Sequence, residues 1–124
     1  MNNVIFSYTR AEAIADGEQF EVSKDLLQTL GFKFPLFITS GIHEIIQQAL
    51  TNCANDYNGI IWDIINMLRF KIKLSPKGTR TVKFKVAIFW IDDCSKDFEF
   101  IAEIGAIDFD NPAPALTVML PSEM

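Results

Sequence analysis

Residues 82–106 read VKFKVAIFWIDDCSKDFEFIAEIGA, and this stretch decides the fold. Apolar side chains recur at every second position on both sides of a polar turn at 92–96. A period of two places them on one face of a strand, so the stretch predicts two strands joined by a hairpin. After a second turn at 110–114, Leu116, Val118 and Leu120 continue the same alternation. Three strands with short polar connections predict an antiparallel meander.

Four helices are expected before the meander. They cover residues 10–16, 24–30, about 40–53 and about 60–74. Thr9 and Gly17 are a suitable cap and stop for the first helix, and Thr39 or Ser40 caps the third. We therefore expect an α+β fold in a single domain over residues 1–124. Its helical N-terminal half is expected to pack on a C-terminal three-stranded antiparallel meander.

The same periodicity predicts which side chains are covered. Cys53 continues the apolar stripe of the third helix and is expected in the core. In the fourth helix, Trp62 and Met67 widen the apolar stripe, so this helix is expected to be covered on more than one side. Pro35 lacks the N–H that a central strand needs, so residues 32–38 are expected to form an edge strand or an extended loop.

The second face of the meander is of mixed character. Lysine and glutamate side chains on it suit solvent, whereas Phe89, Ile91, Ile101 and Ile107 do not. We expect the chain's own short helices to cover these apolar residues. A partner, or a second copy of the chain, is the alternative, because contiguous apolar patches mark contact sites.

Composition limits the classes of function. The chain has 124 residues, of which 49% are hydrophobic, so it has enough apolar area to fold without crosslinks. Its net charge of −5 disfavours direct binding to a nucleic-acid backbone. Neither a signal peptide nor an apolar run of membrane-spanning length is visible, so we expect a cytoplasmic protein with no membrane contact.

No set of residues indicates established chemistry. His43 is the only histidine, and Gln47 stands where a zinc-protease helix needs its second histidine. Cys53 and Cys94 are isolated from each other and from other ligands, so they predict neither a disulfide framework nor a metal site. The sequence therefore predicts no catalytic residues, no metal and no cofactor.

Both ends of the chain carry a resemblance to a known family. Residues 6–17 (FSYTRAEAIADG) and 114–123 (PALTVMLPSE), with shorter matches around Trp62-Asp63 and Met67-Leu68-Arg69, are similar to small proteins of unknown function encoded on bacterial plasmids and integrative elements. The middle departs from the usual pattern, because a phenylalanine-rich segment follows the second helix. The resemblance implies a bacterial mobile-element context. It implies no activity and supplies no catalytic residues.

We expect a non-enzymatic accessory protein of such an element, acting through macromolecular binding, with a protein as its partner. The scaffold does not need Tyr8, Arg10 or Glu12, so these three side chains are candidate binding residues.

A sharper version is inhibition of a host defence, either restriction or a CRISPR effector. Asp92, Asp93 and Asp97 at the hairpin turn are then the binding residues, because carboxylates can occupy a basic site built for phosphates.

Two alternatives remain open. One is a small enzyme that depends on carboxylates, in which Asp108, Asp110 and Asn111 hold a divalent cation. Turns also use Asp and Asn to satisfy backbone groups, so the same residues have a structural explanation. The other alternative is a homodimer that buries the apolar side chains of the meander's second face.

Overall fold

The computed structural model describes residues 9–108 and 110–123 and confirms an α+β fold. Its sheet has five strands, β1 (Gln19–Glu21), β2 (Leu36–Thr39), β3 (Thr81–Phe89), β4 (Ser95–Asp108) and β5 (Asn111–Met119). Their order is β1-β2-β5-β4-β3, and only the β2–β5 pair is parallel. The expected meander, β3–β4–β5, is therefore only part of a mixed sheet, and the N-terminal half is not purely helical.

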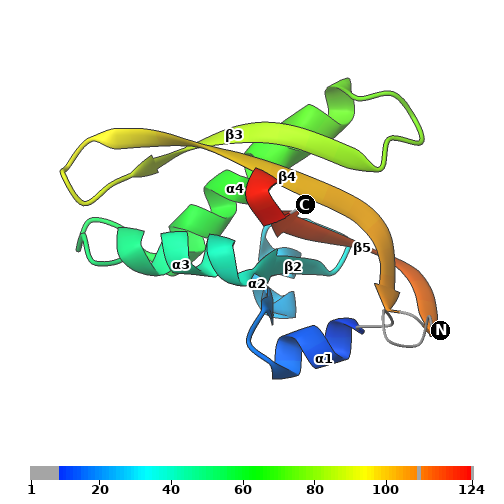
Figure 1. The fold of residues 1–124 in the computed structure, drawn as a ribbon. Coiled ribbons are helices and arrows are strands. Elements are labelled where there is room, and N and C mark those ends of the chain that lie inside the picture. The colour runs from blue at the N-terminus through cyan, green and yellow to red at the C-terminus, as the bar shows by residue number, and fades with distance from the viewer. Residues whose placement is uncertain (1–8, 109, 124) are drawn as a thin grey trace.

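The helices lie on both faces of this sheet (Figure 1). They are α1 (Arg10–Ala15), α2 (Lys24–Thr29), α3 (Ser40–Ala49), α4 (Tyr57–Leu74) and a short 3₁₀ helix, η2 (Pro121–Glu123). The core contains Leu27 of α2, Ile46 of α3 and Ile64 of α4, packed with Phe84 and Val118 of the sheet. Helices α2, α3 and α4 cover the face of the sheet that carries these core residues, whereas α1 lies against the opposite face.

The position of β2 corrects the expectation for residues 32–38. Pro35 immediately precedes β2, and its carbonyl accepts a hydrogen bond from the Leu116 N–H at 3.0 Å. Proline can fill this position because only its carbonyl is used. β2 is thus an interior strand between β1 and β5, and Leu36, Phe37 and Ile38 are all buried.

The pattern of β3 is confirmed, whereas two expectations for the helices are wrong. Along β3, burial alternates as the sequence predicts. Cys53 is exposed, because α3 ends at Ala49 and Cys53 falls in the following turn, off the apolar stripe. Helix α4 begins at Tyr57 rather than near residue 60, since the Asp56 carboxylate caps it by accepting from the Gly59 N–H at 3.2 Å.

The C-terminal residues complete the start of α3. Thr39 is the N-cap residue, but its hydroxyl donates to the Glu123 carboxylate at 2.6 Å instead of capping the helix. Glu123 also accepts from the N–H groups of Gly41 at 3.2 Å and Leu120 at 2.8 Å. A Cβ at position 41 would come within 2.8 Å of the Glu123 carboxylate and of the end of Leu120, so a larger residue there would have to displace these side chains.

Candidate functional site

The Arg10 side chain packs against the face of the sheet that lies opposite the main core. Its guanidinium lies 4.0 Å from the ring centroid of Phe37 and donates to Gln19 Oε1 at 2.8 Å and to Thr117 Oγ1 at 2.9 Å. It also donates to the carbonyl oxygens of Ile107 and Ala106. Burial lowers the pKa of Arg10, and the nearby carboxylates of Asp108 and Glu103 oppose this shift. Arg10 therefore joins α1 to strands β1, β2, β4 and β5.

The expectation that the scaffold does not need Arg10 and Glu12 is therefore wrong. Glu12 forms a capping box with Thr9, in which the Thr9 hydroxyl accepts from the Glu12 N–H and the Glu12 carboxylate accepts from the Thr9 N–H. This reciprocal pair satisfies two backbone donors at the start of α1. Tyr8 lies outside the described residues. Whether any of the three also binds a partner stays a prediction.

Asp108 has a structural role at the same helix. Its carboxylate accepts from the backbone N–H groups of Arg10 at 3.0 Å and Ala11 at 3.1 Å. Asp110 is exposed in the β4–β5 turn. Within residues 9–108 and 110–123, no three His, Cys, Asp or Glu side chains form a group suited to a metal ion. The contacts of Asp108 thus support the structural explanation of this acidic segment.

The three carboxylates of the β3–β4 hairpin differ in their contacts. Asp92 accepts from the Cys94 N–H at 3.2 Å, which stabilises the turn. Asp93 has a positive φ of 62° and accepts from the side chain of Asn52 at 2.8 Å. Asp97 is exposed on β4. Asp92 and Asp93 thus already contribute to folding, and whether the three carboxylates form a binding site stays a prediction.

Two asparagines after α3 hold this hairpin, and the sequence did not predict their role. Asn52 Nδ2 donates to the Trp90 carbonyl at 2.9 Å as well as to Asp93. Asn55 Nδ2 donates to the carbonyls of Ala49 at 2.8 Å and Phe89 at 2.6 Å. Asn52 falls inside the expected third helix, which extends to about residue 53, and Asn55 lies in the interval before the expected fourth helix. Their partners in the hairpin are 34 to 41 residues away, beyond the reach of local patterns.

The solvent-facing side of α4 carries four large apolar side chains. They are Trp62, Met67, Phe70 and Leu74, which are 47%, 40%, 59% and 67% exposed. The expectation that Trp62 and Met67 are covered is therefore wrong. Phe70 follows the buried Ile61 by about two and a half helical turns, so the two residues point to opposite sides. This spacing is a sequence signal that could have identified the outward face of α4.

The exposed apolar surface continues from α4 to the end of β3. Trp62 and Asp63 line a shallow hollow of about 270 Å³ together with Phe89, which is 37% exposed. Burial raises the pKa of Asp63. Ile91, just beyond β3, is 53% exposed, whereas Ile101 is fully buried and cannot belong to a contact surface. The expectation that the short helices cover Phe89 and Ile91 is therefore wrong.

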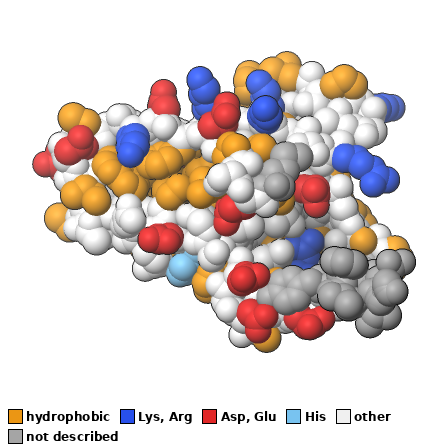
Figure 2. All heavy atoms as spheres, in the orientation of Figure 1, with side chains coloured by type: hydrophobic (Ala, Val, Ile, Leu, Met, Phe, Trp, Pro, Cys, Tyr) orange, Lys and Arg blue, Asp and Glu red, His pale blue; other side chains and the backbone are white. Residues whose placement is uncertain are grey.

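Another apolar area is visible between the β3–β4 hairpin and α3 (Figure 2). In the hairpin, the rings of Trp90 and Phe98 are half-buried, with centroids 5.0 Å apart. The Lys96 ammonium lies 5.0 Å and 5.2 Å from these two centroids. Because a cation already covers these rings, they are less available to a partner than the apolar side chains of α4.

The remaining sequence candidates are separated from this surface. The His43 ring stacks on Phe20 with centroids 3.9 Å apart, so it packs α3 against β1. Cys53 and Cys94 are both exposed free thiols. No helix among the described residues has the length and apolar character needed to cross a membrane. Comparisons with protein-family models, with curated proteins and with solved structures gave no match.

Proposed function

We propose that this chain is a non-enzymatic binding protein that engages another protein through the outward face of α4. The observation that carries the proposal is the exposure of Trp62, Met67, Phe70 and Leu74 on the side of the helix opposite its buried isoleucines. A surface helix normally presents polar residues on that side. A contiguous apolar patch bordered by charged residues is typical of protein contact sites.

The patch has the composition of an interface centre. Aromatic residues and methionine are enriched at such centres, and a few of them supply most of the binding free energy. Phe70 and Leu74 are the most exposed, at 59% and 67%. Covering each of them would contribute on the order of 1–2 kcal/mol from the exposed apolar area. Lys71 and Lys73 in the last helical turn supply the polar border.

The test is a capture experiment from bacterial lysate with the immobilised chain. Phe70→Glu places a charge at the centre of the patch without disturbing the core, because Phe70 is 59% exposed. Lys83→Glu, on the exposed side of β3, is the control for a change of surface charge. We expect wild type and Lys83→Glu to capture the same protein, and Phe70→Glu to lose it. Capture of the same proteins by all three would contradict the proposal.

Self-association is a second candidate, favoured by the distribution of charge along α4. Asp63 lies in the N-terminal half of the helix, whereas Lys71 and Lys73 lie in its last turn. Two copies of α4 packed antiparallel around a two-fold axis would therefore set opposite charges against each other. Light scattering distinguishes the candidates. A dimer that Phe70→Glu dissociates supports self-association, whereas a monomer at high concentration supports binding of a different protein at the patch.

The mobile-element context remains a proposal that rests on the resemblance of residues 6–17 and 114–123. The identity of the neighbouring genes tests it: we expect them to encode plasmid or conjugation functions, and purely chromosomal housekeeping neighbours would contradict it. For the anti-defence version, Asp97 is the hairpin carboxylate with no role in the turn contacts described above. Replacing Asp97 with Lys is expected to abolish protection of an incoming plasmid from restriction, and unchanged protection would refute that version.

A further inference from the structure

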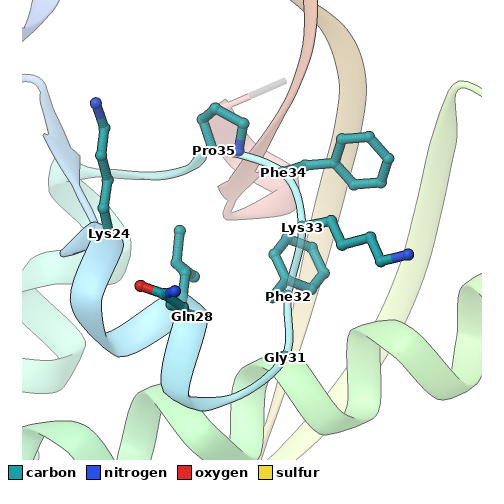
Figure 3. A pocket seen from close by; sticks show the side chains of 8 residues that line it. Lys24, Gln28, Gly31, Phe32, Lys33, Phe34 and Pro35 are labelled. Carbon is teal, nitrogen blue, oxygen red and sulfur yellow. The ribbon is translucent and has the colours of Figure 1, made fainter.

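The loop between α2 and β2 borders two hollows in the surface, and its residues 31–34 line both of them. Lys24 and Gln28 of α2 line the first, which has a volume of about 510 Å³. The Lys33 and Phe34 side chains extend to the other side of the loop, away from Lys24 and Gln28 (Figure 3). There they line a second hollow, bounded also by α4, β4 and β5. This second hollow adjoins the outward face of α4, because Lys73 lines the hollow and also borders that face.

The second hollow has apolar walls and the size of a small-ligand site. Phe34 forms one wall, Ile72 of α4 forms another, and Ile104 and Leu116 of the sheet lie opposite the loop. Its volume is about 320 Å³. Ligand pockets range from about 300 to 1,000 Å³, so this one suits a small molecule rather than a large cofactor.

Three cationic residues border the same hollow, whose accessible lining is almost wholly apolar. They are Lys33, Arg69 and Lys73, and no carboxylate is among the described residues that line it. The lining therefore has the opposite charge to the chain as a whole, which carries a net −5. Within residues 9–108 and 110–123, neither lysine takes part in an ion pair. An anionic group would give these ammonium groups a partner.

Arg69 is already oriented beside the hollow. Its guanidinium donates to the Leu30 carbonyl at 2.8 Å and to Asn66 Oδ1 at 3.1 Å. These contacts use part of the five N–H donors of the guanidinium and fix its plane. The remaining N–H groups make no other hydrogen bond among the described residues, and orienting them toward an anion would cost little additional entropy.

We propose that this hollow binds a small amphiphile, with its apolar body against Phe34, Ile104 and Leu116 and its anionic head at Lys33 and Lys73. Apolar walls alone would accept any apolar molecule of suitable size. The cations add selection for a negative head, because a charge-assisted hydrogen bond is stronger than a neutral one. This site goes beyond the proposed protein-binding function and does not depend on it.

The test compares three ten-carbon probes by isothermal titration calorimetry with the full chain. They are decanoate, decanol and decyltrimethylammonium, which differ in the charge of the head. We expect decanoate to bind most tightly and the cationic probe not to bind. The double variant Lys33→Ala/Lys73→Ala should weaken decanoate binding by about tenfold or more. The matched control Lys83→Ala/Lys85→Ala, on the exposed side of β3, should leave it unchanged.

Two further variants locate the bound probe. Ile104→Trp fills the hollow and should abolish binding. Phe34→Ala removes a wall residue and should weaken binding, and we expect this variant to fold because Phe34 is 44% exposed. Thermal unfolding of each variant confirms that it is folded. Equal binding of the three probes, no binding of decanoate, or decanoate binding that survives both Lys33→Ala/Lys73→Ala and Phe34→Ala would each overturn the proposal.

Discussion

Replacing Arg10 with Ala should destabilise the whole domain, although Arg10 lies in a six-residue helix near one end of the chain. The guanidinium donates four hydrogen bonds, to side chains of Gln19 and Thr117 and to the carbonyls of Ala106 and Ile107. It also lies over the Phe37 ring. The substitution removes all these contacts at once and uncovers part of the sheet.

The size of the effect follows from these contacts. A hydrogen bond from a charged group contributes about 1.5–3 kcal/mol, but bonds made by one side chain are not additive. The ring contact adds about 1 kcal/mol at a half-exposed site. We therefore expect a loss of about 3 kcal/mol. For a domain of this size that lowers the melting temperature by roughly 10 °C.

Chemical denaturation with urea measures this loss directly. Arg80→Ala is the matched control, because Arg80 is exposed and its side chain makes no hydrogen bond among the described residues. It should change the unfolding free energy by less than about 0.5 kcal/mol. Arg10→Lys keeps the charge but not the planar guanidinium with its several N–H donors, so it should recover only a minor part of the lost unfolding free energy. If Arg10→Ala is as mild as Arg80→Ala, the reasoning is refuted.

Three more substitutions test other parts of the structure. Burial raises the pKa of Asp63, so its ionised form costs stability at neutral pH and that cost disappears as the pH falls toward the usual value of 3.8. Asp63→Asn should therefore raise the melting temperature at pH 7, with a gain that shrinks toward pH 4. Asn55→Ala removes two hydrogen bonds, to Ala49 and Phe89, and should cost about 1–3 kcal/mol in urea unfolding. Glu123→Ala should cost about 1 kcal/mol and speed hydrogen exchange at the Gly41 N–H, as expected for loss of a helix cap.

The sequence predicted features that depend on neighbouring residues. The capping of α1 by Thr9, its stop at Gly17 and the β3–β4 hairpin all follow from residues within a few positions of one another. Their physical causes are local, because caps and turns are satisfied inside one segment.

The sequence could not predict pairings between distant segments. The parallel pairing of β2 with β5 joins Leu36 to Leu116, and the Glu123 carboxylate reaches Thr39 and Gly41. Neither contact leaves a periodic pattern in the chain. The hydrogen bonds of Arg10 are similar, since its four partners lie in three different strands, β1, β4 and β5, and no composition rule points to them.

The outward face of α4 could have been predicted from the sequence, but its apolar residues were misinterpreted. Trp62 and Met67 were assigned to a wide buried stripe because they are apolar. The helix has only one covered side, so apolar residues opposite Ile61 and Ile64 must be exposed. The hollow beside Lys33 was beyond prediction, since it depends on the placement of β2 in the sheet interior.

The most direct test of the proposed function is site-specific photo-crosslinking in living bacteria. A photo-reactive phenylalanine analogue is placed at position 70, on the outward face of α4, and in a second strain at position 99, on the exposed side of β4. If the outward face of α4 is the binding surface, we expect one discrete crosslinked protein from position 70 and none from position 99. Crosslinking of the same protein from both positions, or from position 99 alone, would contradict it.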